Sequence, residues 1–269
     1  MSRSPRFPLG LDRVHGKPAA RTGTGTVLRP QRPVQQAAQD QARRMPTSGL
    51  GLDSAAVRQR MVDRLRAAGL QCEPVLNALR LVERHRFVDS ALATQAYEDT
   101  SLPIGLSQTI SKPSVVGLML SLLFDGAHAR DQGHLGRVLE IGTGCGYQAA
   151  LLLHLGRQLV SVERLQALHE RARDNLVGMR HADLRLVFGD GMLGHPPRAP
   201  YQSIIAAAGG DQLPAAWLDQ LAVGGRLVAP LQTGFSGGQR LVIVDRGPEG
   251  LITHHQDAVH FVPLKSGTE

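Results

Sequence analysis

The most informative stretch of this chain is Val138-Leu139-Glu140-Ile141-Gly142-Thr143-Gly144-Cys145-Gly146-Tyr147-Gln148. An apolar strand pattern ends here in three glycines at every second position and continues directly into a helical pattern. Glycine is needed where a strand turns sharply into a helix beside a ligand, because only glycine allows both the unusual φ values and the close approach. The stretch therefore predicts a strand–turn–helix unit that binds a nucleotide-like cofactor.

The next acidic residue along the chain, Glu163, supports a ligand at this turn. It ends a second apolar run, Leu159-Val160-Ser161-Val162, which predicts the neighbouring parallel strand. A carboxylate at the tip of that strand can accept hydrogen bonds from both hydroxyls of a ribose. A tight turn without a ligand is the alternative, and the placement of Glu163 disfavours it.

The glycine spacing distinguishes two cofactor classes. Dinucleotide-binding turns have a G-x-G-x-x-G pattern, which brings a helix N-terminus to a pyrophosphate. Tyr147 stands where that pattern has its third glycine, and the third glycine of this chain is Gly146. The observed order, an acid at Glu140 followed by three glycines at alternate positions, resembles the loop of class I methyltransferases. The resemblance implies S-adenosylmethionine (AdoMet), a cofactor without phosphate.

Composition indicates a globular chain with an unusual N-terminal segment. The 269 residues, 42% of them hydrophobic, suffice for one large α/β domain or a domain with a smaller appendage. No window approaches the roughly 18 consecutive apolar residues of a membrane span, so we expect a soluble protein without a membrane partner. Cys72 and Cys145 show neither a CxxC nor a metal-ligand spacing, which favours a cytoplasmic location and no metal site. Cys145 is interpreted as a small side chain filling the turn rather than a catalytic thiol.

The net charge of +7 is confined to the start of the chain. Residues 1–50 contain nine basic residues, two acidic residues and six prolines, whereas the remainder is neutral. This composition predicts a disordered basic, proline-rich extension over residues 1–52. It lacks the apolar segment of a secretory signal, and its prolines disfavour an amphipathic transit helix. Such a tail would attract RNA or acidic surfaces weakly, and we expect no specific nucleic-acid partner.

Residues 53–134 are expected to form an N-terminal helical cap that carries the substrate and active-site loop. A first helix begins after Asp53 as N-cap, has apolar residues at helical spacing and ends at Gly69. A second starts at Glu73, and a third runs from about Pro113 to Phe124. The apolar positions of the three helices are Val57, Met61, Val62, Leu65, Val75, Leu76, Leu79, Val82, Val116, Met119, Leu120 and Leu123.

Residues 135–269 are expected to form the cofactor-binding core, an α/β fold with a doubly wound, Rossmann-like parallel sheet. Two last strands, separated by the turn signal Arg246–Gly250, predict an antiparallel hairpin at the sheet edge. The expected strands are 137–141, 158–163, 184–188, 203–208, 225–230, 240–245 and 252–261, and the expected helices are 147–155, 165–177 and 213–221.

Ligands of such sheets bind at the carboxyl ends of the strands. This rule singles out Gly142–Gly146, Glu163, Asp190, Gly191 and the segment 207–210. Asp190 lies between two glycines after the third strand, where its carboxylate can accept the exocyclic amine of adenine. The alternative for Asp190 is a purely structural place in a tight turn.

The segment before the glycine loop names a family. It reads Leu102-Pro103-Ile104-Gly105-Leu106-Ser107-Gln108-Thr109-Ile110-Ser111-Lys112-Pro113, which as a structure predicts a non-periodic polar loop, with Ser111 as a candidate N-cap. The chain resembles the protein-L-isoaspartate (D-aspartate) O-methyltransferases, which share a Leu-Pro-Ile-Gly…Gln-Thr-Ile-Ser-x-Pro signature. The resemblance runs in order from Met61 to Leu264 and leaves only residues 1 to about 52 outside it.

This resemblance implies methyl transfer from AdoMet to the α-carboxylate of L-isoaspartyl residues in damaged proteins and peptides. The ester then cyclises to a succinimide that reopens partly to aspartate, so the enzyme would be a repair methyltransferase and a monomer. An acceptor carboxylate is already ionised at pH 7 and needs no general base, so the active-site serine, Ser111, would position it by a hydrogen bond. The implied cofactor-binding residues are Gln108, Thr109, Ile110, Ser111, Glu140, Gly142, Gly144, Glu163, Asp190 and Gly191, with Glu140 fixing the glycine loop or a nearby cofactor group.

Some features leave alternatives open. Asp99 has either a structural or a substrate-side role, and Ala207-Ala208-Gly209-Gly210 departs from the family's small-Ala-Ala-Pro and predicts a looser loop. A methyltransferase acting on another carboxylate, a small molecule or RNA is disfavoured by the signature and by the lack of an aromatic or Asn-Pro-Pro-Tyr-like pocket after the fourth strand. A noncatalytic AdoMet-binding or nucleic-acid-binding module, driven by the basic tail, is the other alternative.

Overall fold

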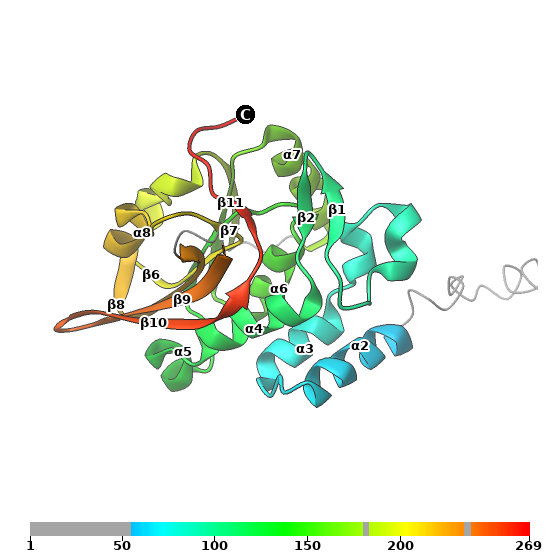
Figure 1. The fold of residues 1–269 in the computed structure, drawn as a ribbon, viewed down its shortest axis with the longest axis horizontal. Helices are drawn as coiled ribbons and strands as arrows, with labels where there is room; N and C mark the ends of the chain where they lie inside the picture. The colour runs from blue at the N-terminus through cyan, green and yellow to red at the C-terminus, as the bar shows by residue number, and fades with distance from the viewer. Residues whose placement is uncertain (1–54, 180–182, 234–237) are drawn as a thin grey trace, which may run out of the picture. The chain divides into compact units, whose positions relative to one another are not determined.

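The computed structural model describes residues 55–179, 183–233 and 238–269 (Figure 1). The predicted extension over residues 1–52 and the predicted N-cap at Asp53 lie outside these residues. Elements are numbered as in Figure 1.

A seven-stranded sheet organises the described chain. Its strand order is β10-β9-β8-β6-β3-β4-β5, with β3 next to both β4 and β6. The pairs among β5, β4, β3, β6 and β8 are parallel, whereas β9 pairs antiparallel with β8 and with β10. The predicted doubly wound sheet with an antiparallel hairpin at its edge is confirmed. The strands are β3 Arg137–Ile141, β4 Gln158–Glu163, β5 Leu184–Phe188, β6 Tyr201–Ala206, β8 Leu221–Thr233, β9 Gly238–Gly247 and β10 Gly250–Val259.

Helices cover both faces of the sheet because successive strand residues point to opposite sides. Val138 of β3 belongs to the apolar cluster formed with the helical segment, α6 and α7, whereas Leu139 belongs to the cluster that contains Trp217 of α8. Parallel strands buried on both faces need such near-continuous apolar sequences. The helices that follow the strands are α6 Tyr147–Leu155, α7 Gln166–Leu176 and α8 Ala215–Gln220.

The three expected helices of the N-terminal segment are present, and their apolar faces join the core. Leu76 and Met119 are fully buried in the same cluster as Tyr147 and Val228 of the sheet region. Three further short helices of this segment were not predicted, namely the 3-10 helices Arg84–Phe87 and Ser90–Gln95 and the α-helix α5. Helix α5 has the polar sequence AHARDQ, and Ala129 is its one buried residue, so it carries no apolar period. The helices are α2 Ala55–Ala67, α3 Glu73–Leu81, α4 Pro113–Phe124 and α5 Ala127–Gln132.

The signature segment folds as a β-hairpin, so the prediction of a non-periodic loop was wrong. Strands β1 (Leu102–Gly105) and β2 (Gln108–Ile110) pair antiparallel around Leu106 and Ser107, whose φ values are 51° and 57°. Left-handed angles at both central residues match the twist of a two-residue hairpin. Leu102, Ile104 and Ile110 are buried, and this apolar side anchors the hairpin to the core.

Helix α4 begins in a different way from the one expected. Lys112, not Ser111, is its N-cap residue, and no side chain of its own caps it. Instead, Asp99 Oδ1 accepts a hydrogen bond from the backbone N–H of Ser114 at 2.8 Å. A carboxylate at a helix N-terminus satisfies an otherwise free donor and suits the helix dipole. Asp99 thus has a structural contact, and Ser111 is left without a capping role.

Two short strands bring the end of the chain to the carboxyl ends of the sheet. β7 (Ala208–Gly209) pairs in parallel with β11 (Val262–Pro263), which follows β10. Gly210 forms a bridge to Leu231. The looser loop predicted over residues 207–210 is therefore wrong, because this segment is tied into strand pairing. A Cβ at Gly209 would lie 3.0 Å from Pro230 Cβ and 2.8 Å from Gln239 Nε2, the end of a flexible side chain.

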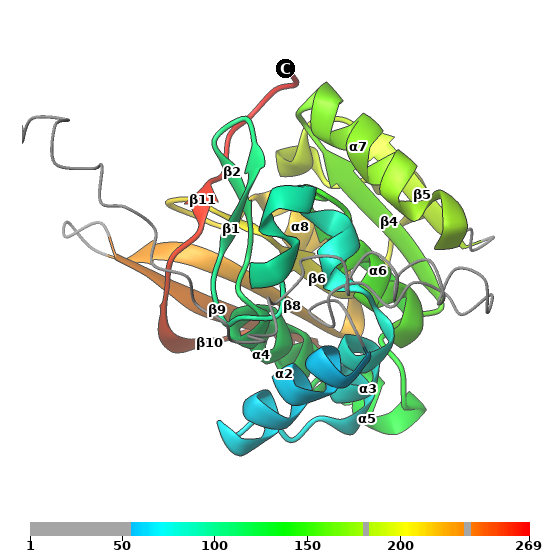
Figure 2. The same ribbon diagram turned by 90° about the vertical axis from the view of Figure 1, so that its right-hand side faces the viewer.

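Figure 2, turned from the first view, shows the β1–β2 hairpin beside β11. The two segments are about 150 residues apart in sequence. No helix among the described residues has the length and apolar character needed to cross a membrane.

Candidate cofactor and substrate site

The glycine loop adopts the backbone angles that its sequence predicted. Gly142, Gly144 and Gly146 have φ values of 89°, 57° and 89°, all in the left-handed region. Added side chains would be strained there, and a Cβ at Gly146 would also press against Leu176 Cδ1 at 3.1 Å. Gly142 and Gly144 of this loop line a cavity, whereas Gly146 packs against α7.

Glu163 is held rigidly next to this loop. Its Oε2 accepts the backbone N–H of Gly144 at 2.8 Å, and its Oε1 accepts that of Leu165 at 3.0 Å. The residue is 5% exposed. Each carboxylate oxygen has a second lone pair, so both oxygens can still accept a hydrogen bond from a ligand.

Helix α7 braces the two walls of the site. Asn175 Nδ2 donates to the carbonyl of Cys145 in the glycine loop at 2.9 Å. One turn earlier, Arg171 Nη1 donates to the carbonyl of Ile104 in β1 at 2.8 Å. Glu163 ends β4, the strand before this helix, so α7 follows the acidic residue in the chain and contacts both the loop and the hairpin.

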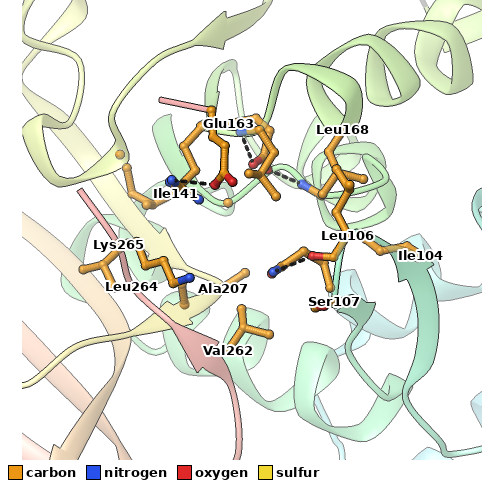
Figure 3. Close-up of a pocket in the computed structure, with 18 of the residues that line it drawn as sticks. Ile104, Leu106, Ser107, Ile141, Glu163, Leu168, Ala207, Val262, Leu264 and Lys265 are labelled. Atoms are coloured by element: carbon orange, nitrogen blue, oxygen red, sulfur yellow. Dashed lines mark hydrogen bonds and ion pairs between the residues drawn. The ribbon is translucent and has the colours of Figure 1, made fainter. Parts of the chain in front are cut away.

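A cavity of about 840 Å³, called here the main cavity, opens above these elements (Figure 3). Its size falls within the range of small-molecule sites. In Figure 3, Glu163 lies on one side, Leu106 and Ser107 come from the hairpin, and Val262, Leu264 and Lys265 come from the end of the chain. The predicted residues that line it are Gln108, Thr109, Ser111, Gly142, Gly144, Glu163 and Gly191.

Three predicted residues lie outside this lining. Ile110 is packed in the apolar core, and Glu140 is buried beneath the glycine loop. Asp190 uses Oδ1 to accept the N–H of Met192 at 2.8 Å and Oδ2 to accept that of Gly267 at 2.7 Å. The carboxylate thus caps a turn and holds the C-terminal segment, and its neighbour Gly191 is the residue that reaches the cavity.

The C-terminal segment closes one side of the main cavity. The backbone of Glu269 accepts from Gln166 N–H and donates to the carbonyl of Arg164, both at 2.8 Å. Lys265 and Glu269 line the cavity. The family resemblance points to Lys265 as a departure that affects the contacts of the site, whereas no sequence signal pointed to Glu269, because its contribution depends on where the chain returns after β11. The residues of the first turn of α7 were also missed, although the strand-end rule that found Glu163 covers them.

Glu140 belongs to a buried polar network under the loop. It accepts hydrogen bonds from Ser161 Oγ at 2.5 Å and from Gln148 Nε2 at 3.1 Å. The hydroxyls of Ser161 and Thr143 lie 2.6 Å apart. These contacts link β3, β4, α6 and the glycine loop. Burial raises the pKa of the Glu140 carboxyl to about 8, although the bonds from Ser161 and Gln148 lower it.

This raised pKa predicts a pH-dependent stability. A carboxyl whose folded-state pKa exceeds its unfolded value of 4.5 stabilises the fold fully below pH 4.5, and this contribution is lost as the pH rises through about 8. The glutamine of Glu140→Gln does not titrate. From about pH 5 to about pH 8.5, we therefore expect the unfolding free energy of this variant to rise by roughly 2–4 kcal/mol relative to that of the unsubstituted protein. Urea unfolding at both pH values measures this. If the unfolding free energies of the two proteins changed equally with pH, Glu140 would be ionised in the folded protein.

Cys145 is not placed for nucleophilic chemistry. Its side chain is 3% exposed, and burial raises the pKa of its thiol. A thiol needs an exposed, pKa-lowering environment to react as a thiolate. This agrees with the interpretation of Cys145 as a small side chain filling the turn.

A second concavity, called here the side cleft, adjoins the main cavity and measures about 670 Å³. Thr109 and Ser111 from the hairpin segment line both, as do Val262 and Pro263 of β11. Among the hydrogen bonds of the described residues none involves Ser111 Oγ, and Ser111 lines both concavities. Ser111 therefore stands where a ligand in one space would meet a ligand in the other.

Comparison with known proteins identifies the family. The model of the family described as protein-L-isoaspartate(D-aspartate) O-methyltransferase matches residues 56–269. A protein-L-isoaspartate O-methyltransferase of Methylibium petroleiphilum is 57% identical over 99% of this chain and 97% of its own length. One of Leptothrix cholodnii is 56% identical over 99% and 95%.

Solved structures agree. A protein-L-isoaspartate O-methyltransferase with 27% identity superposes with a TM-score of 0.69 over 78% of this chain and 66% of that one. A Plasmodium falciparum protein titled as a putative member, in complex with S-adenosyl-L-homocysteine, is 19% identical and has a TM-score of 0.66 over 77% and 98%, which shows the fold. The resemblance inferred from the signature is confirmed, and the chain belongs to the protein-L-isoaspartate(D-aspartate) O-methyltransferase family.

Proposed function

We propose that this chain transfers a methyl group from AdoMet to the α-carboxylate of L-isoaspartyl residues in damaged proteins and peptides. One observation carries the proposal: Thr109 and Ser111 line both the main cavity and the side cleft. A methyl transfer between two bound molecules requires such a junction, because donor and acceptor must meet in a defined orientation. The names of the relatives that match almost the whole chain support the same reaction.

The main cavity fits AdoMet by its chemistry. Its floor is a glycine loop with left-handed angles, and beside it stands the buried Glu163 with free lone pairs for ribose hydroxyls. Apolar side chains such as Ile104, Leu168 and Val262 provide walls for the remainder. When bound, AdoMet supplies an electrophilic methyl group on a sulfonium. Gln108, Gly142, Gly144 and Gly191 complete the proposed set of contacts.

The residues of this chain then have to bind and orient the acceptor. A carboxylate is ionised at neutral pH, so no side chain need remove a proton. The Ser111 hydroxyl donates a hydrogen bond to the acceptor carboxylate and holds it at the junction. This hydroxyl is a positioning donor in contact with the substrate, not a nucleophile. Ile110, Glu140 and Asp190 support the site from outside the lining, through the core, the glycine loop and the C-terminal segment respectively.

A matched pair of peptides tests the reaction. One peptide contains isoaspartate and the other aspartate at the same position, and both are incubated with radiolabelled AdoMet and the full chain. We expect label in the isoaspartyl peptide only, because the two isomers present their free carboxylates on different backbones. Equal labelling of both peptides would overturn the substrate assignment, and labelling of neither would overturn the proposed function.

We further propose that the enzyme acts as a cytoplasmic monomer on isoaspartyl proteins, with no specific nucleic-acid, membrane or metal partner. Cys72 and Cys145 are free cysteines, which is typical of a reducing compartment. Sedimentation of the full chain at micromolar concentration checks the oligomeric state. Activity of a chain that lacks residues 1–50 would support catalysis independent of the basic extension.

A further inference from the structure

The two concavities differ in charge. Two cations, Arg164 and Lys265, and three carboxylates, Glu163, Glu170 and Glu269, line the main cavity. Among the described residues that line the side cleft, by contrast, Lys112 and His260 are the basic residues, and none is acidic. The other lining residues are Ser101, Thr109, Ser111, Val115, Ala258, Val259, Phe261, Val262 and Pro263. Among the described residues that line the side cleft, Lys112 is therefore the one permanent charge, and it is positive.

Lys112 is fixed at its backbone and free at its side chain. It directly follows Ser111, has extended angles (φ −60°, ψ 147°) and is the N-cap residue of α4. Its carbonyl accepts from the N–H groups of Val115 at 3.1 Å and Val116 at 3.2 Å. The nearby carboxylate of Asp99 is engaged with Ser114 N–H and does not line the cleft. The Lys112 ammonium is therefore the main charge of the hairpin-side wall.

His260 lines the same cleft from the segment between β10 and β11. The adjacent Phe261 N–H donates to Gln239 Oε1 at 2.6 Å, which attaches this segment to β9. Two basic side chains from separate parts of the fold thus face one space. An acceptor peptide bound in the side cleft would therefore lie near both side chains.

We propose that Lys112, assisted by His260, makes the side cleft select isoaspartyl peptides that carry an acidic side chain next to the damaged residue. The inference rests on the proposed function and names a preference within its substrate class. Lys112 is exposed, so its attraction is screened by water and salt. The preference is accordingly modest, about three- to fivefold in kcat/KM at low salt.

The preference acts on binding rather than on the chemical step. The flanking carboxylate does not react, and its contact with Lys112 is the same before and during methyl transfer. Interactions of equal strength in both states lower KM and leave kcat unchanged. If Lys112 instead paired with the reacting carboxylate, every isoaspartyl peptide would respond equally to its removal.

The test uses three isoaspartyl peptides that differ only in the flanking residue, which is glutamate, glutamine or lysine. The quantity measured is the ratio of kcat/KM between the glutamate and glutamine peptides, at about 50 mM and about 500 mM salt. The unsubstituted enzyme is expected to give a ratio of about three to five at low salt, carried by KM and reduced towards one at high salt. The lysine peptide is expected to be the poorest substrate.

Lys112→Gln is expected to bring the ratio to about one, and Lys112→Glu to invert it. Arg130→Gln removes the same charge from α5, away from both concavities, and is expected to keep the ratio of the unsubstituted enzyme. A ratio near one in the unsubstituted enzyme, or a ratio unchanged by Lys112→Gln, overturns this inference alone. If the enzyme methylates none of the three peptides, the proposed function is overturned instead.

Discussion

Replacing Glu163 by alanine is expected to weaken AdoMet binding by about 100-fold. The carboxylate can accept two ribose hydroxyls, and charge-assisted hydrogen bonds each contribute about 1.5 kcal/mol or more. The loss of two such bonds gives about 3 kcal/mol, or two decades in Kd. The substitution also leaves the N–H groups of Gly144 and Leu165 without their acceptor, which loosens the glycine loop. Isothermal titration calorimetry with AdoMet measures the effect.

Glu170→Ala is the matched control for this experiment. Glu170 lines the same cavity and carries the same charge, but it is exposed, and its side chain accepts only from Gln166 Nε2 at 3.0 Å among the described contacts. We expect its removal to change Kd less than about threefold. If both variants lost the same AdoMet affinity, the cavity would act through its overall charge, and the ribose-binding role of Glu163 would be wrong. Thermal unfolding shows whether each variant is folded.

Replacing Ser111 by alanine is expected to lower kcat by about 10- to 100-fold and to change AdoMet affinity less than about threefold. One hydrogen bond to a carboxylate, together with the orientation it imposes, corresponds to about 1.4–2.7 kcal/mol of the barrier. Cofactor binding should be little affected, since Glu163 and the glycine loop are intact. Steady-state kinetics with the isoaspartyl peptide and calorimetry with AdoMet separate the two effects.

Ser101→Ala provides the comparison for Ser111. Ser101 is exposed and lines the side cleft but not the main cavity, so it does not stand at the junction. We expect the kcat of Ser101→Ala to stay within about threefold of that of the unsubstituted enzyme. If Ser111→Ala weakens AdoMet binding tenfold while kcat is unchanged, Ser111 is a cofactor contact and its role at the acceptor is excluded.

The central part of the fold was predictable because its signals are local. The apolar runs before Gly142 and before Glu163 define buried strands, and the rule that parallel strands end at one edge brings the two together. Glycines at alternate positions specify left-handed angles wherever they stand in the chain. The loop conformation and the placement of Glu163 beside it therefore followed from residues fewer than thirty apart.

The hairpin of the signature was missed for a physical reason. Its pairing depends on the burial of Leu102, Ile104 and Ile110 against the core, and its turn uses Leu106 and Ser107 at angles that glycine or asparagine usually occupy. Neither residue signals such a turn. The polar composition of the segment therefore favoured a loop, whereas tertiary packing stabilises two strands.

At the site, the position of Asp190 was predictable from local sequence, whereas its hydrogen-bond partner was not. The strand-end rule brought it to the right edge of the sheet, but the rule does not say which partner its carboxylate takes. In the folded chain Gly267, which lies 77 residues further along the chain, donates to Oδ2. That partner depends on the pairing of β7 with β11, which no local pattern specifies.

The sequence by itself determined the fold class, the family and the kind of cofactor, because strand periodicity, glycine angles and a short signature depend on neighbouring residues. Only the tertiary structure decided that Ser111 lies between two concavities, that the end of the chain lines the main cavity and that Lys112 and His260 face one cleft. These are contacts between segments more than a hundred residues apart. They arise from packing, which minimises the free energy of the whole chain rather than of any segment.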